Sequence, residues 1–123
     1  PGFDAAPIHP NEAYSGHTSE ASDMLYFEGK QGQVVSIVLT GPSYYQYFSL
    51  RDDKNDGLIG CEVNSQTACA VERYSLPYTG IFYLLVDRTV AEEYKKRQSC
   101  VNNPPFPSWC FRGGPYSVTL SFQ

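Results

Sequence analysis

Short runs of apolar residues, separated by residues that favour turns, recur along most of the chain. Apolar and β-branched side chains at every second position are typical of strands with one buried face, while Gly, Pro, Asn and Asp clusters are typical of the turns between them. The pattern predicts seven strands, at 24–28, 33–39, 45–51, 58–63, 69–74, 81–86 and 116–122. Seven short strands in one chain of 123 residues predict a single all-β domain, an antiparallel sandwich.

The third predicted strand alternates aromatic and polar residues. Its period predicts that Phe48 and Leu50 face the core, so that the tyrosines at 45 and 47 face outward. Exposed aromatic rings stack on sugars or pack on fibrous proteins, although aromatic residues also cover sheet edges and fill cores. The candidate ligand-binding residues are Tyr44, Tyr45, Tyr47 and Trp109.

Two segments depart from the strand pattern. Residues 1–22 hold three prolines and two histidines with little periodicity, which predicts an irregular lead-in before a sandwich domain at 23–123. The insertion at 88–113 contains good helix formers from Val90 to Gln98, with Glu93 and Arg97 in the favourable order, so we expect a short helical turn there. Three prolines between 104 and 107 predict a surface loop after it.

The four cysteines are spaced too widely for metal-binding CxxC pairs. We therefore predict disulfides, Cys61–Cys69 and Cys100–Cys110, because each closes a short local loop, while the crossed pairings remain open. Disulfides indicate an oxidising location, extracellular or periplasmic. The chain begins with Pro1 rather than Met, so we expect a mature or excised form whose targeting segment has been removed.

Charge and motifs exclude several classes of function. Nine basic and thirteen acidic residues give a net charge of −4 without a broad basic face, which argues against nucleic acid as a partner. The longest apolar run, Ile81 to Val86, is far shorter than the ~20 residues of a membrane span. The sequence has no GxSxG, HExxH or phosphate-binding glycine motif, and we expect no enzymatic activity.

The acidic run that begins at Asp52 does not fit a calcium loop. In EF-hand register the third ligand position is Lys54 and the twelfth is Val63, so two ligands are missing. We interpret the run as a hairpin turn.

The order of these elements resembles a known family. The segments that carry the resemblance are Asn11-Glu12-Ala13, Asp23-Met24-Leu25-Tyr26-Phe27, Gly32-Gln33-Val34-Val35-Ser36-Ile37, Leu50-Arg51-Asp52, the run from Leu76 to Val86, and Gly114-Pro115-Tyr116-Ser117-Val118. Over roughly positions 11–123 the chain resembles the bacterial pre-peptidase C-terminal domains, a group that includes the collagen-binding domains of secreted collagenases. The resemblance implies a jelly-roll-like sandwich of about seven to eight strands, and a non-catalytic accessory role beside secreted enzymes.

Some members of that family bind calcium through the lead-in and a D-x-D-Y motif. The resemblance places such a site at Asn11, Glu12 and Asp23, but Leu25 stands where the second carboxylate of the motif would be. We therefore expect no cofactor, with calcium as the one candidate.

The leading hypothesis is a secreted module that binds a polysaccharide or an extracellular matrix protein through its exposed aromatic residues. The alternative is a structural subunit of an extracellular assembly, which associates with itself through sheet edges or through the N-terminal arm.

Overall fold

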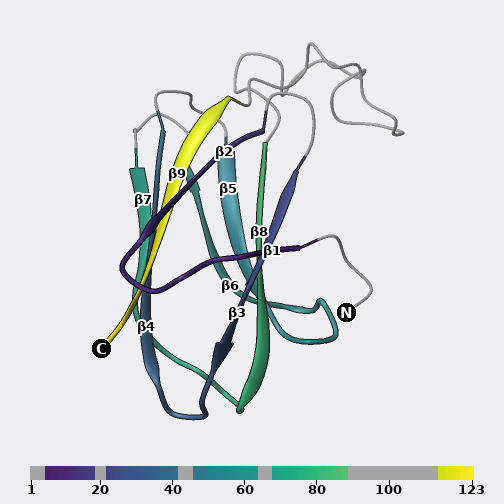
Figure 1. Cartoon of the computed structure of the whole chain (residues 1–123), viewed down its shortest axis with the longest axis vertical. Helices are drawn as coiled ribbons and strands as arrows, with labels where there is room; N and C mark the ends of the chain where they lie inside the picture. The colour runs from purple at the N-terminus through teal and green to yellow at the C-terminus, as the bar shows by residue number, and fades with distance from the viewer. Residues whose placement is uncertain (1–4, 19–21, 42–45, 64–67, 89–113) are drawn as a thin grey trace.

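The computed structural model describes residues 5–18, 22–41, 46–63, 68–88 and 114–123. These residues form nine strands and no helix (Figure 1). The strands are β1 (Ala6–Pro7), β2 (Ala13–His17), β3 (Asp23–Gly29), β4 (Val34–Thr40), β5 (Gln46–Arg51), β6 (Gly57–Val63), β7 (Ala68–Ser75), β8 (Gly80–Arg88) and β9 (Pro115–Phe122). Strands β3 to β9 confirm the seven predicted strands to within one or two residues at each end.

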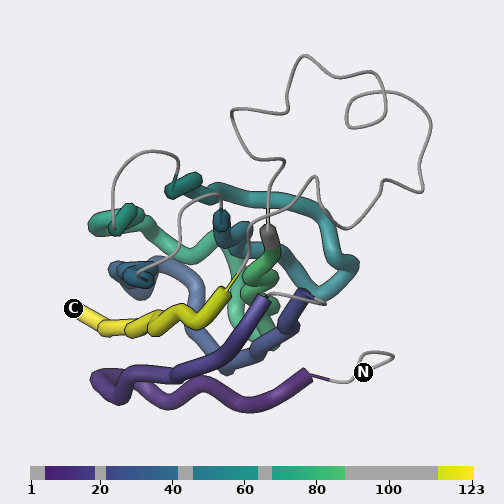
Figure 2. The backbone as a smooth tube through the Cα atoms, turned by 90° about the horizontal axis from the view of Figure 1, so that it is seen from above, coloured from purple at the N-terminus to yellow at the C-terminus, as the bar shows by residue number. Residues whose placement is uncertain are grey.

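The strands form two sheets that face each other as a sandwich (Figures 1 and 2). The five-stranded sheet has the order β1-β3-β8-β5-β6, and the four-stranded sheet has the order β2-β9-β4-β7. Every neighbouring pair is antiparallel except β1 and β3, which run parallel. The predicted all-β sandwich is therefore confirmed.

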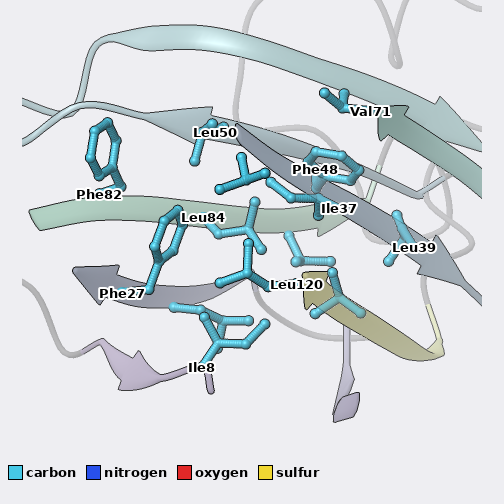
Figure 3. Close-up of a cluster of buried hydrophobic side chains, with 14 of the residues drawn as sticks. Ile8, Phe27, Ile37, Leu39, Phe48, Leu50, Val71, Phe82, Leu84 and Leu120 are labelled. Atoms are coloured by element: carbon cyan, nitrogen blue, oxygen red, sulfur yellow. The ribbon is translucent and has the colours of Figure 1, made fainter. Parts of the chain in front are cut away.

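The core lies between the two sheets and follows the period of two along each strand (Figure 3). Phe48 and Leu50 on β5 are fully buried, as the alternation predicts. Phe27 on β3 stacks on Phe82 on β8 with 5.5 Å between ring centroids. Strands β3, β4, β8 and β9 also contribute Leu25, Val35, Ile37, Leu39, Leu84, Val86, Val118 and Leu120, each no more than 1% exposed.

The lead-in is not irregular, contrary to the prediction. Strand β1 pairs with β3 in the five-stranded sheet, β2 pairs with β9 in the four-stranded sheet, and Ile8 between them is buried in the core. Neither strand shows the alternation of apolar and polar residues that predicts a strand. Each lies at an edge of a sheet, where backbone hydrogen bonds to the neighbouring strand hold it. These two strands also explain why nine strands are present instead of seven or eight.

A disulfide closes the opposite side of the sandwich. Cys61 on β6 bonds to Cys69 on β7, which confirms this predicted pair and joins the edges of the two sheets. A loop with a sequence separation of 8 gains about 2.5 kcal/mol in the chain-entropy model. The bond also fits the predicted oxidising location outside the cytoplasm. Cys100, Cys110 and the predicted helical turn at 90–98 lie outside the described residues.

A tyrosine and a carboxylate link the two sheets where β9 and β3 begin. The Tyr116 hydroxyl donates a hydrogen bond of 2.7 Å to the Asp23 carboxylate. Burial is the main cause that raises the pKa of Tyr116 well above its usual value, followed by the hydrogen bond and charge of Asp23. Gly16 on β2 leaves room for this pair, since a Cβ there would lie 2.5 Å from the Tyr116 hydroxyl and 2.6 Å from an Asp23 oxygen.

A second polar link joins the sheets at the same end. The buried Thr18 hydroxyl donates to the side-chain oxygen of Gln46 at 2.9 Å and accepts from the Gly114 N–H at 3.2 Å. The Gln46 side-chain nitrogen donates to the Pro115 carbonyl at 3.4 Å. Residues from β5 and from the segments that flank β2 and β9 are thereby held together.

We expect the free energy of unfolding to fall as the pH rises above about 10, the usual pKa of tyrosine. The unfolded chain releases the Tyr116 proton in that range while the folded protein retains it, so folding binds a proton and loses stability as pH rises. Urea unfolding of wild type and Tyr116→Phe from about pH 8 to about pH 11 measures this contribution. Tyr26→Phe, on the outer face of β3, is the control. Identical pH profiles for wild type and Tyr116→Phe would contradict the account.

Thr18→Val should destabilise the protein by about 1–3 kcal/mol, because it removes the buried hydroxyl that bonds to the Gln46 oxygen and to the Gly114 N–H. The matched control is Thr40→Val, whose exposed hydroxyl donates to Ser117 at 3.4 Å. Chemical denaturation measures both variants. If both variants lose the same free energy of unfolding, the buried hydrogen bonds of Thr18 contribute no more to stability than the exposed hydrogen bond of Thr40. That result would contradict the prediction.

Candidate functional site

A shallow hollow of about 520 Å³ lies on the outer face of the five-stranded sheet. Ser49 on β5 and Gly60 on β6 are direct cross-strand neighbours, and two such small residues leave the middle of the hollow open. A Cβ on Gly60 would lie 2.5 Å from the Phe48 carbonyl oxygen, so only glycine fits at this position. The hollow is lined by Tyr47, Phe48, Ser49, Arg51, Gly60, Cys61 and Glu62.

Two carboxylates flank Tyr47 at one end of the hollow. Tyr47 lies opposite Glu62 on β6 and opposite Asp87 on β8. Partial burial raises the pKa of Tyr47, the charge of Asp87 and a hydrogen bond to Asp87 raise it further, and the charge of Arg51 lowers it. The raised pKa keeps the phenol protonated at neutral pH, and the exposed Glu62 lies opposite Tyr47 on the neighbouring strand.

Arg51 lies at the other end of the hollow, four residues along β5 from Tyr47, or about 13 Å in an extended strand. Its Nη1 donates to the Asn55 carbonyl at 3.2 Å, and to the Asn55 side chain at 3.4 Å. The turn that holds Asn55 is built by the Asp52 carboxylate, which accepts from the N–H groups of Lys54 and Asp56 at 2.9 Å. The hollow thus has an acidic, aromatic end and a basic end.

Of the four predicted ligand-binding residues, the structure places Tyr47 at this hollow. Tyr44, Tyr45 and Trp109 lie outside the described residues. The described residues that flank them lie close together, since Gln46 pairs with Arg88 and Gly41 approaches the Pro115 carbonyl. These flanking residues lie at the end of the sandwich where Tyr47 is found.

Sequence reasoning missed Arg51, Glu62 and Gly60 as parts of one site. None of the three residue types signals a binding site by itself. Only the register between β5 and β6 brings these residues together. The sequence did contain a signal that Gln46 is buried. Gln46, Phe48 and Leu50 are alternate residues of the same strand, so all three face the core.

Asn11 and Asp23 of the calcium candidate contact different residues of β9, and calcium binding at Asn11, Glu12 and Asp23 stays a prediction. The Asn11 N–H donates to the Leu120 carbonyl at 2.7 Å, whereas Asp23 accepts the hydroxyl of Tyr116. Leu120 and Tyr116 are four residues apart on β9, which corresponds to about 13 Å. Within the ranges that the structure describes, there is no cluster of three or more His, Cys, Asp or Glu side chains suited to a metal ion. Nor do these residues contain a helix long and apolar enough to cross a membrane.

Searches with the sequence found no matching family model and no similar curated protein. Solved structures with the same fold do exist. The periplasmic inhibitor of g-type lysozyme, PliG, from Aeromonas hydrophila aligns with a TM-score of 0.61 and 14% identity, over 97% of this chain and 96% of the inhibitor. The PliG of Salmonella Typhimurium aligns with a TM-score of 0.59 and 17% identity, over 98% of this chain and all of that chain.

The third solved structure is the pre-peptidase C-terminal domain of a collagenase from Bacillus anthracis. It aligns with a TM-score of 0.60 and 14% identity, over 96% of this chain and 95% of that domain. At such low identity these likenesses concern the fold alone. The chain therefore has the fold of the pre-peptidase C-terminal domains, which is shared by the PliG inhibitors.

Proposed function

We propose that the chain is a non-catalytic accessory module that acts outside the cytoplasm and binds a polysaccharide or a matrix protein at the hollow between Tyr47 and Arg51. The observation that carries the proposal is the hollow itself, with a partly buried tyrosine and an exposed glutamate at one end. An aromatic ring supplies a stacking surface, while Glu62, Ser49 and Arg51 supply an acceptor, a hydroxyl and a cation.

The rigidity of this surface supports binding. Tyr47, Ser49 and Glu62 lie on paired strands, and the disulfide at Cys61 holds β6 beside Glu62. A ligand would therefore meet side chains that are already ordered, which lowers the entropy cost of association.

The same geometry supports a role without catalysis. A glycosidase needs two carboxyl groups on opposite sides of the scissile bond. Here Tyr47 lies between Glu62 and Asp87 in the sheet, so an aromatic residue separates the two carboxylates.

A second candidate is the inhibition of a cell-wall hydrolase. It is favoured by the two lysozyme inhibitors among the similar structures, which align over 97% and 98% of this chain. The acidic end of the hollow and the net charge of −4 would suit a cationic protein surface.

The test is a binding screen against insoluble cellulose, chitin, peptidoglycan and collagen, together with an inhibition assay on a g-type lysozyme. With the polymer that binds, Tyr47→Ala should weaken affinity about tenfold or more, because it removes the central aromatic contact. Glu62→Gln should weaken it less, and Glu72→Gln on β7 is the matched control. Tyr44→Ala, Tyr45→Ala and Trp109→Ala test the three residues outside the described ranges.

Failure to bind any of the four polymers, with the fold intact by circular dichroism, would contradict the first candidate. Inhibition of the lysozyme that Tyr47→Ala weakens would favour the second candidate instead.

A further inference from the structure

The sandwich has four sheet edges, and three of them carry features that oppose pairing with another strand. Strand β1 is two residues long and ends in Pro7. The edges of β6 and β7 are joined by the Cys61–Cys69 bond, and β7 also contains Arg73 in the left-handed region at φ 57. Strand β2 differs, because it pairs with β9 over five residues without a register shift and contains no proline and no Lys, Arg, Asp or Glu.

The register shows which backbone groups of β2 face outward. The Thr18 N–H donates to the Gly114 carbonyl at 2.9 Å, in line with the pairing of Gly16 with Tyr116. In an antiparallel pair the hydrogen-bonding residues alternate, so the even-numbered residues bond to β9 and the N–H and C=O groups of Ala13 and Ser15 point away from it. Both residues are exposed.

We propose that β2 pairs in antiparallel orientation with β2 of a second copy of this chain, around a two-fold axis at Ser15. The four-stranded sheets of the two copies would join into one sheet of eight strands, four from each copy. Ser15 would exchange two backbone hydrogen bonds with Ser15 of the second copy. Such an isologous contact is closed, so the assembly stops at a dimer.

The sequence of β2 is complementary to itself in this register. Ala13 lies opposite His17 of the second copy, so no two side chains of like charge meet. On the other face, Tyr14 lies opposite Gly16 of the second copy, which presents no side chain against the ring.

Other registers fit less well. An axis at Tyr14 or Gly16 would also pair odd-numbered residues with one another, but only three residues of β2 would then lie opposite β2 of the second copy. An axis at Ala13 would bring Asn11, in the left-handed region at φ 65, into the pair and break the ladder. An axis at Ser15 uses all five residues of β2.

The dimer goes beyond the proposed binding function and leaves its site open. Strand β2 belongs to the four-stranded sheet, whereas the hollow lies on the outer face of the five-stranded sheet. Loss of dimerisation and loss of ligand binding can therefore be measured separately.

The experiment combines sedimentation with cysteine cross-linking of the full chain. Residues in a hydrogen-bonded antiparallel pair have Cα atoms about 5.5 Å apart, within reach of a disulfide or a short bismaleimide. We expect Ser15→Cys to yield a covalent dimer. Ala13→Cys alone should yield none, whereas a mixture of Ala13→Cys and His17→Cys should yield one. Wild type under the same oxidation controls for the native cysteines.

Ser15→Pro provides a second variant, since it removes an outward N–H without breaking a hydrogen bond to β9. It should sediment as a folded monomer where wild type is a dimer. A wild type that is monomeric up to millimolar concentration would overturn the proposal. A dimer that Ser15→Cys does not cross-link would overturn it too, because the contact would then lie elsewhere.

Discussion

The packing of the two sheets depends on two covalent connections, one at each side of the sandwich. On one side the chain passes directly from β1 in the five-stranded sheet to β2 in the four-stranded sheet, and Ile8 between them is buried. On the other side the Cys61–Cys69 bond joins β6 to β7. Cys61 also lines the hollow, so the bond that fixes the sandwich also fixes the position of Glu62 and Gly60 beside Tyr47.

This closure separates the two proposed interaction surfaces. The outer face of the five-stranded sheet carries the hollow, whose ends differ in charge because Glu62 and Arg51 lie at opposite ends of one strand pair. Strand β2 is an outer strand of the four-stranded sheet. Binding at the first and pairing at the second use different atoms, and a dimer would present two hollows to a repetitive polymer.

The sequence predicted those parts of the molecule in which local pattern and burial agree. Phe48 and Leu50 are buried as the period of two requires, and Cys61–Cys69 follows from a short loop between two strands. Strands β1 and β2 could not be recognised, because β1 contains Pro7, β2 contains Gly16, and both form by docking on strands far away in the sequence. Tyr47 was identified by its type, whereas Arg51 and Glu62 joined the site only through register.

The most direct test of the account is to map ligand contacts by NMR. Backbone amide shifts would be recorded while a soluble fragment of the polymer that binds in the screen is added. The largest changes should occur on β5 and β6, at Tyr47, Ser49, Gly60 and Glu62, because these residues line the hollow. Changes concentrated on β4 and β9 of the four-stranded sheet, with β5 and β6 unaffected, would contradict it.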